Sequence, residues 1–223
     1  MQINQLTVIY FVTLIAAIIL HEISHGVVAL WFGDDTARKA GRLTLNPVPH
    51  IDPFGSIIMP AIGALSGIPV IGWAKPVPVN PNRLRNPRRD MLIVSLAGPT
   101  TNLLLMVASA MIARRLYHPT LDANFVIIAD LPLAVQIALS FAVVNLFLGL
   151  FNLFPIPPLD GAALLERILP REWLPRWQSF QPYGVLVIFA LVLWGGPGRV
   201  LDPFLRHLYR YICLLYTSDA ADE

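Results

Sequence analysis

Apolar residues divide the chain into long hydrophobic stretches separated by polar, proline-rich loops. No charged side chain occurs among residues 1–20, and the apolar pattern resumes after a short polar turn and runs to residue 32. At 1.5 Å per residue, residues 5–32 are long enough to cross a hydrocarbon core of about 30 Å as one helix. Residues 91–113 and 131–154 form two further apolar stretches of this kind. The pattern predicts an all-α polytopic membrane protein with three clear transmembrane helices.

Other segments are apolar but interrupted or short. Residues 53–74 carry no charge, yet proline and glycine recur along them, which predicts a re-entrant segment instead of a straight span. Residues 183–194 are apolar and end in a glycine-rich turn, and we expect a fourth crossing there. Residues 162–177 and 199–212 mix basic and apolar side chains, as amphipathic or interfacial elements do.

Two shorter patterns lie inside and between these elements. Residues 42–45 alternate in the manner of a short strand. The second span contains SLAGPTTNL with Gly98, Pro99 and Asn102, and small residues in a span favour close contact between helices. We therefore interpret this motif as a helix-packing site.

Composition supports the assignment to a membrane and excludes other classes. Apolar residues make up 56% of the 223 residues and charged residues only 13%, and the mean hydropathy is +0.62. A net charge of +2, divided among the loops, gives no indication of nucleic-acid binding. Cys213 is the only cysteine, so neither a disulfide framework nor a cysteine-based zinc site is available.

One turn of the first span carries the candidate chemistry. His21, Glu22 and His25 form a His-Glu-x-x-His sequence inside an apolar stretch. Four residues apart on a helix, the two histidines share one face about 6 Å apart along the axis, so both rings can reach one metal ion. Glu22 lies on the adjoining flank, beside the metal. Charged groups at this depth cost about 2.5 kcal/mol or more each, which favours a functional role over a hydrogen-bonded histidine pair.

A catalytic zinc site needs a third protein ligand and leaves one position open. Asp160 is the best candidate. A proline run at the end of the third span holds the chain extended and places this residue at a fixed distance along the chain from the end of that helix. Without the histidines, the same Asp-Gly would be interpreted as a turn. His50 and Asp52 are interpreted as ordinary polar groups of a loop.

Charge bias gives an independent prediction of topology. Residues 33–90 contain eight lysines and arginines, and the positive-inside rule places them in the cytoplasm if residues 53–74 only dip into the membrane. In that arrangement the histidines and Asp160 meet near the cytoplasmic face. If residues 53–74 crossed fully, Asp160 would be carried to the opposite face.

These motifs together resemble the site-2 protease family of intramembrane zinc metalloproteases, in its small form without a PDZ domain. The resemblance rests on HEISHG, GRLTLNP, AGPTTN and NLFPIPPLDG, in that order. It implies one zinc ion per chain held by His21, His25 and Asp160, with Glu22 as general base. It also implies that Asn152 orients the substrate or stabilises the oxyanion.

The resemblance implies a zinc-dependent endopeptidase of the bacterial cell membrane, with its active site toward the cytoplasm. Its substrates are membrane proteins, cut in or near their transmembrane segments, and its setting is the lipid bilayer. Two alternatives stay open: a membrane zinc carrier that uses the same ligands, and a catalytically inactive scaffold. We expect residues 1–212 to form one membrane-embedded domain. Residues 213–223 resemble a translated sequencing adapter, so we expect the natural C-terminus to be missing.

Overall fold

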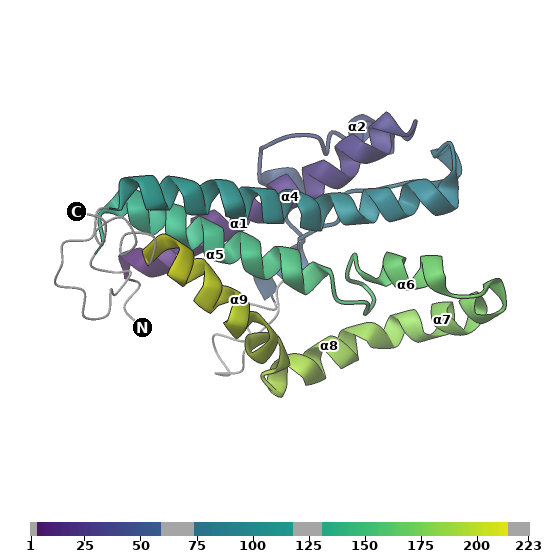
Figure 1. Ribbon diagram of the computed structural model, residues 1–223. Helices are drawn as coiled ribbons and strands as arrows, with labels where there is room; N and C mark the ends of the chain where they lie inside the picture. Colours follow the sequence, from purple (N-terminus) through teal and green to yellow (C-terminus); the bar gives the residue numbers. More distant parts are fainter. Residues whose placement is uncertain (1–3, 59–73, 118–130, 214–223) are drawn as a thin grey trace, which may run out of the picture.

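Three long helices form the body of the protein. The computed structural model describes residues 4–58, 74–117 and 131–213. In these residues α1 (Gln5–Trp31), α4 (Pro87–Leu116) and α5 (Leu133–Asn152) all contact one another and lie side by side (Figure 1). Each is long and apolar enough to cross a membrane. The predicted all-α architecture is confirmed for the described residues, together with three helices that could span a membrane.

Shorter helices connect and extend this bundle. They are α2 (Thr36–Lys39), α6 (Ala162–Ile168), α7 (Leu174–Phe180), α8 (Gly184–Leu193) and α9 (Gly196–Cys213), with single helical turns at Val48–His50, Pro53–Ile58, Pro81–Arg83, Arg171–Trp173 and Gln181–Tyr183. Helices α6 and α7 lie beyond the end of α5, α8 runs back from them, and α9 returns along the bundle (Figure 1). At 1.5 Å per residue, the ten residues of α8 cover about 15 Å, half of a hydrocarbon core. The fourth crossing over 183–194 stays a prediction.

Local sequence sets where the long helices begin and end. The Asn4 side chain caps α1 by accepting a hydrogen bond from the backbone N–H of Thr7 at 2.8 Å. Helix α1 ends before Gly33, whose φ of +105° suits a residue without a side chain. Pro87 opens α4 at the first helical position, where its missing N–H costs nothing.

The apolar core lies between α4 and α5, with one residue from α9, and half of its buried members are alanine. Its buried members are Ala110, Ala113, Val135, Ala138, Leu139, Ala142, Leu146 and Leu208. Without a hydrophobic driving force in lipid, close van der Waals contact between helices holds such a bundle together, and alanine permits that contact.

The ends of the predicted re-entrant segment lie together. The backbone N–H of Lys75 donates to the carbonyl of His50 at 2.9 Å, and Arg85 N–H donates to the carbonyl of Phe32 at 3.2 Å. The first pair brings together the chain on either side of residues 53–74, and the second brings the start of α4 to the end of α1. Residues 59–73 lie outside the described residues, so the path between these ends stays a prediction.

The short strand predicted over 42–45 is wrong. The described residues contain no strand, and residues 43–45 form bends. Arg42 turns inward instead of alternating: its side chain is buried and its Nη2 donates to the carbonyl oxygens of Lys75 and Pro76. Residues 214–223 of the expected tail lie outside the described residues, and the expected single domain of residues 1–212 stays a prediction.

Candidate metal centre

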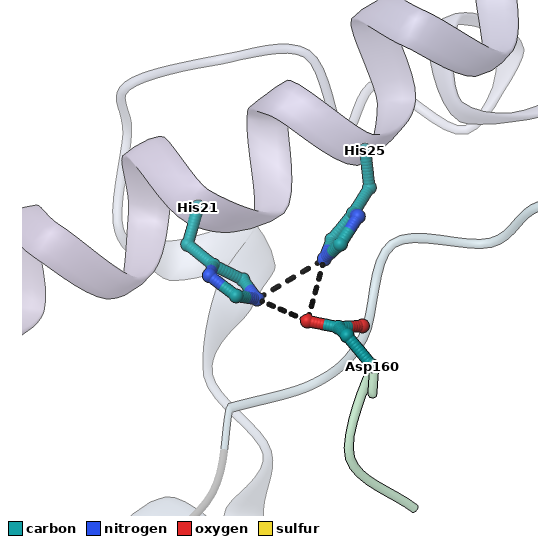
Figure 2. Close-up of side chains that lie close together, drawn as sticks. All are labelled: His21, His25 and Asp160. Carbon is teal, nitrogen blue, oxygen red and sulfur yellow. Dashed lines mark hydrogen bonds and ion pairs between the residues drawn. The ribbon is translucent and has the colours of Figure 1, made fainter. Parts of the chain in front are cut away.

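Two imidazoles and one carboxylate meet inside the helical bundle. His21 and His25 lie one turn apart on α1, and Asp160 follows α5 (Figure 2). The Nε2 atoms of the two rings are 3.0 Å apart, and Oδ2 of Asp160 lies 3.0 Å and 3.4 Å from Nε2 of His21 and His25. Both histidines are buried. The structure therefore brings together the three residues predicted as ligands.

The hydrogen bonds of the outer ring nitrogens fix which nitrogen carries the proton. Nδ1 of His25 lies 2.7 Å from the carbonyl oxygen of Val94, which can only accept, so this Nδ1 is protonated. Nδ1 of His21 lies 2.5 Å from Oδ1 of Asn102, also an acceptor. In the neutral rings both Nε2 atoms consequently carry a lone pair, and both lone pairs face Asp160.

This donor set fits a metal cation. In the neutral rings, two imidazole lone pairs and a carboxylate oxygen converge, and none of the three groups then supplies a proton to the others. Oδ2 of Asp160 is buried and has no hydrogen-bond donor in the described part of the chain. A buried acceptor without a donor is unfavourable unless a cation neutralises it. Imidazole nitrogen and carboxylate oxygen are ligands that zinc prefers, and three protein ligands leave one position open.

The turn after α5 is what returns Asp160 to the histidines. The backbone N–H of Gly161 donates to the carbonyl of Asn152 at 2.7 Å and closes a loop of proline-rich chain. A Cβ on Gly161 would overlap the backbone of Leu153 and Phe154, so only glycine fits this closure. The loop thus places the residue before Gly161 next to α1.

Helix α4 leaves space for the two rings at Gly98. A Cβ built on Gly98 would lie 2.5 Å from Nε2 of both His21 and His25. The sequence interpretation of this motif as a helix-packing site is therefore incomplete, because its glycine makes room for imidazole rings as well as for a backbone.

Glu22 contacts a segment far away in the sequence. Its Oε2 accepts a hydrogen bond from the backbone N–H of Val77 at 2.7 Å. Its carboxylate is close enough to His25 for an electrostatic interaction, but it is not a member of the His21, His25 and Asp160 group. This placement agrees with a group beside the metal that is not a ligand.

Two further side chains hold the segment that contacts Glu22. Arg42 binds the carbonyls of Lys75 and Pro76, and Oδ2 of Asp34 accepts from the N–H of Asn80 at 2.6 Å. Burial alone would raise the pKa of the Asp34 carboxyl, but hydrogen bonds from Thr36 and Asn80 outweigh burial and hold this pKa below its ordinary value. Residues 75–80 are consequently fixed against the cytoplasmic end predicted for α1.

The remaining sequence candidates make local contacts. Nδ2 of Asn152 donates to the carbonyl of Leu148 on its own helix at 3.0 Å, so the predicted oxyanion role stays a prediction. Nε2 of His50 contacts the carbonyl of Thr44 at 3.0 Å, and Asp52 accepts from the N–H of Gly55 at 2.7 Å, as polar groups of a loop do.

The sequence interpretation assigned no functional role to Asn102. This residue is fully buried on α4 and contacts Nδ1 of His21. The signal that identifies it is an uncharged amide in the middle of an apolar span, where a polar group needs a specific partner.

Comparison with known proteins agrees with this geometry. Residues 9–195 match Peptidase family M50. The "Putative zinc metalloprotease YwhC" of Bacillus subtilis is 38% identical over 197 residues, which are 87% of this chain and 84% of that protein. The "Putative zinc metalloprotease Rip2" of Mycolicibacterium smegmatis is 34% identical over 175 residues, 78% of this chain and 62% of that protein.

The Rip2 protein of Mycobacterium tuberculosis is also 34% identical, over 187 residues that are 82% of this chain and 65% of that protein. The chain thus spans less than two thirds of either Rip2 protein. No solved structure matches the chain. The family match covers most of the chain, including all the residues of the metal centre. The chain therefore belongs to peptidase family M50, the site-2 protease family.

Proposed function

We propose that this protein is a zinc-dependent intramembrane endopeptidase that hydrolyses peptide bonds in or near the transmembrane segments of membrane proteins. The observation that carries the proposal is the convergence of the two Nε2 atoms, whose Nδ1 partners are acceptors, with a buried carboxylate oxygen, the histidines lying on a helix long enough to span a membrane. Membership of a metalloprotease family supports the same conclusion.

In this proposal His21, His25 and Asp160 hold one zinc ion. Zinc bound by them supplies a Lewis acid that polarises a peptide carbonyl and lowers the pKa of water from about 15.7 toward 7. Glu22 is the general base and takes the proton of the attacking water. Its Oε2 keeps the N–H of Val77, which holds the carboxylate in place while its second oxygen receives the proton.

The substrate has to be unwound before it is cut. A transmembrane helix satisfies its own amides, so a peptide carbonyl becomes accessible only after local loss of helix structure. The amide of Asn152 is proposed to orient this exposed carbonyl or to stabilise the oxyanion, which requires it to exchange its bond to Leu148 for the substrate.

The active site is proposed to face the cytoplasm. The hydrogen bonds that join His50 to Lys75 and Phe32 to Arg85 support a path in which residues 33–90 begin and end on one side of the membrane. Eight basic residues in this range favour the cytoplasmic side. His25 lies near this end of α1, six residues before Trp31.

The test compares the purified wild-type protein with Glu22→Gln and His21→Ala in detergent, using metal analysis and cleavage of transmembrane peptides. Glu22→Gln keeps the size of the side chain but removes the base, so we expect zinc to stay bound while cleavage falls by about 10²-fold or more. His21→Ala should lose both zinc and cleavage. Glu172→Gln, the same change at an exposed glutamate, is the matched control and should behave as wild type.

Cleavage by zinc-loaded Glu22→Gln at the wild-type rate would refute the protease proposal. Zinc uptake into liposomes containing the protein would then identify a carrier. Zinc binding with neither cleavage nor uptake in the wild-type protein would identify a scaffold.

A further inference from the structure

A chain of buried amides crosses from α1 to α5 through α4. Oδ1 of Asn102 contacts Nδ1 of His21 at 2.5 Å, and Nδ2 of Asn102 donates to Oδ1 of Asn145 at 2.7 Å. Nδ2 of Asn145 donates to the carbonyl oxygen of Phe141 at 2.8 Å. Both asparagines are fully buried. One polar path therefore links a metal-centre histidine to the backbone of the third long helix.

The far end of this path fixes the direction of every hydrogen bond along it. The carbonyl of Phe141 can only accept, so the atom of Asn145 that faces it must be the amide nitrogen. The oxygen of Asn145 then faces Asn102 and requires a donor from it. The oxygen of Asn102 is consequently left facing His21, and this acceptor places the proton on Nδ1.

The two histidines find an acceptor for the Nδ1–H group in different ways. Nδ1 of His25 finds a backbone carbonyl on α4, that of Val94. Nδ1 of His21 meets a side-chain amide, which on its own could turn and present its NH2 group instead. Asn145 removes that freedom together with the carbonyl of Ala17, which accepts a longer hydrogen bond of 3.5 Å from the same Nδ2, because both acceptors lie on one side of the Asn102 amide. The shorter of the two bonds goes to a residue on α5, which thus helps to decide how the ring nitrogen of His21 is protonated.

We propose that Asn102 and Asn145 are positioning residues that hold His21 in the Nδ1-protonated form, with the Nε2 lone pair directed at the metal. This inference rests on the proposed zinc site. Partners of this kind typically change metal affinity by about 10- to 100-fold when they are removed. Neither asparagine contacts the metal in this role, and each acts through His21.

The test uses leucine and aspartate variants at each position in the full-length protein. Leucine removes both polar atoms of the amide, whereas aspartate keeps the oxygen that accepts. The dissociation constant for zinc is measured by competition with a chelator in detergent, and the electronic spectrum of the Co²⁺-substituted protein reports ligand geometry. Ser140→Ala is the matched control, because Ser140 is a buried α5 residue whose hydroxyl has no partner in the described part of the chain.

We expect Asn102→Leu to weaken zinc binding by about 10- to 100-fold and to alter the Co²⁺ spectrum. Asn102→Asp should bind zinc more tightly than Asn102→Leu, because its carboxylate still accepts from Nδ1, although it leaves the oxygen of Asn145 without a donor. At Asn145, leucine should also weaken zinc binding more than aspartate does, but both losses should be smaller than at Asn102. These two variants test the inference if Asn102→Leu does not fold. Ser140→Ala should leave affinity and spectrum unchanged.

Equal weakening by leucine and aspartate at Asn102 would overturn the inference, because a purely structural amide is lost in both. Unchanged affinity in Asn102→Leu would overturn it as well, provided that His21→Ala loses zinc. Zinc retention by His21→Ala would instead show that the proposed metal site is wrong, so the two failures are distinguishable.

Discussion

Replacing Gly98 by alanine tests whether the metal centre depends on the space that α4 leaves for it. The added Cβ would lie 2.5 Å from Nε2 of both His21 and His25, whereas ordinary van der Waals contact begins at 3.4 Å. The rings or the helices must therefore separate by nearly 1 Å. Metal–ligand distances are reproduced to within about 0.2 Å in well-formed sites, so this displacement is several times the tolerance.

The size of the effect follows from the cost of overpacking. An inserted carbon in a tightly packed position costs about 1 to 3 kcal/mol. The apoprotein can relieve the overlap by turning the imidazoles, but the metal-bound protein cannot, so most of this cost opposes binding. At about 1.4 kcal/mol for each factor of ten, we expect zinc affinity to fall by about 5- to 150-fold.

The apoprotein should not be destabilised in the same way. Alanine is more favourable than glycine inside a helix by about 0.5 to 1 kcal/mol. Turning the rings strains their Nδ1 hydrogen bonds to Asn102 and Val94, so we expect the helix preference of alanine to offset this cost only in part and the melting temperature of the metal-free Gly98→Ala protein to lie close to that of wild type. The combination of weaker zinc binding and an intact fold separates the loss of a site from the loss of the structure.

Gly149→Ala is the matched control on α5. Its added Cβ would meet the Leu103 side chain at 2.9 Å and the carbonyl oxygen of Pro99 at 3.3 Å, and neither group belongs to a histidine. Zinc affinity is measured by chelator competition and stability by thermal unfolding in a chelator. Wild-type zinc affinity in Gly98→Ala would show that the rings do not occupy the space described here.

Three further variants test the ligands, the segment that holds Glu22, and the topology. Asp160→Ala should lose most of the bound zinc while Asp52→Ala keeps it, and the reverse result would show that the third ligand is misassigned. Arg42→Met releases two backbone carbonyls, so cleavage should fall by about tenfold through poorer positioning of the base, with zinc content unchanged. Cysteines introduced at Thr36 and Asn82 should be labelled from the same side of sealed vesicles, and labelling from opposite sides would refute the re-entrant topology.

The spans are predictable from the sequence because the bilayer allows few alternatives. A long apolar stretch without charge has to satisfy its backbone internally, which leaves a helix as the only conformation. Helix α4 begins four residues before the predicted span and ends three residues after it, and its extra turns carry Arg88 and Arg115 beyond the apolar part. The prediction of a short strand over residues 42–45 fails because the conformation there depends on a contact distant in the sequence. Arg42 binds the carbonyls of a segment more than 30 residues away.

In the candidate site, too, the features that are local in the sequence are predictable and those that depend on distant contacts are not. The spacing of His21 and His25 and the proline run before Asp160 are local features, and the sequence identifies all three residues. The roles of Gly98 and Asn102 are not local, because they depend on which face of α4 meets α1. In a helix that is apolar on every side, the hydrophobic pattern does not indicate that face.

The three helices contribute different parts of the same centre, and this division explains why the motifs lie so far apart in the chain. Helix α1 supplies the two histidines proposed as ligands but neither the space nor the acceptors that orient them. Helix α4 supplies both, through Gly98, the carbonyl of Val94 and the amide of Asn102. The turn after α5 supplies the carboxylate.

None of these parts forms a metal site alone, because a histidine pair on an isolated helix has no fixed tautomer and no third ligand. Packing of the bundle places three acceptors together, which is unfavourable in a medium of low dielectric constant without a positive charge between them. The favourable contacts of the surrounding helices have to offset that cost before metal binds. With the proposed zinc ion, the bundle would be organised in advance around a cation, and binding of that cation would stabilise the folded state.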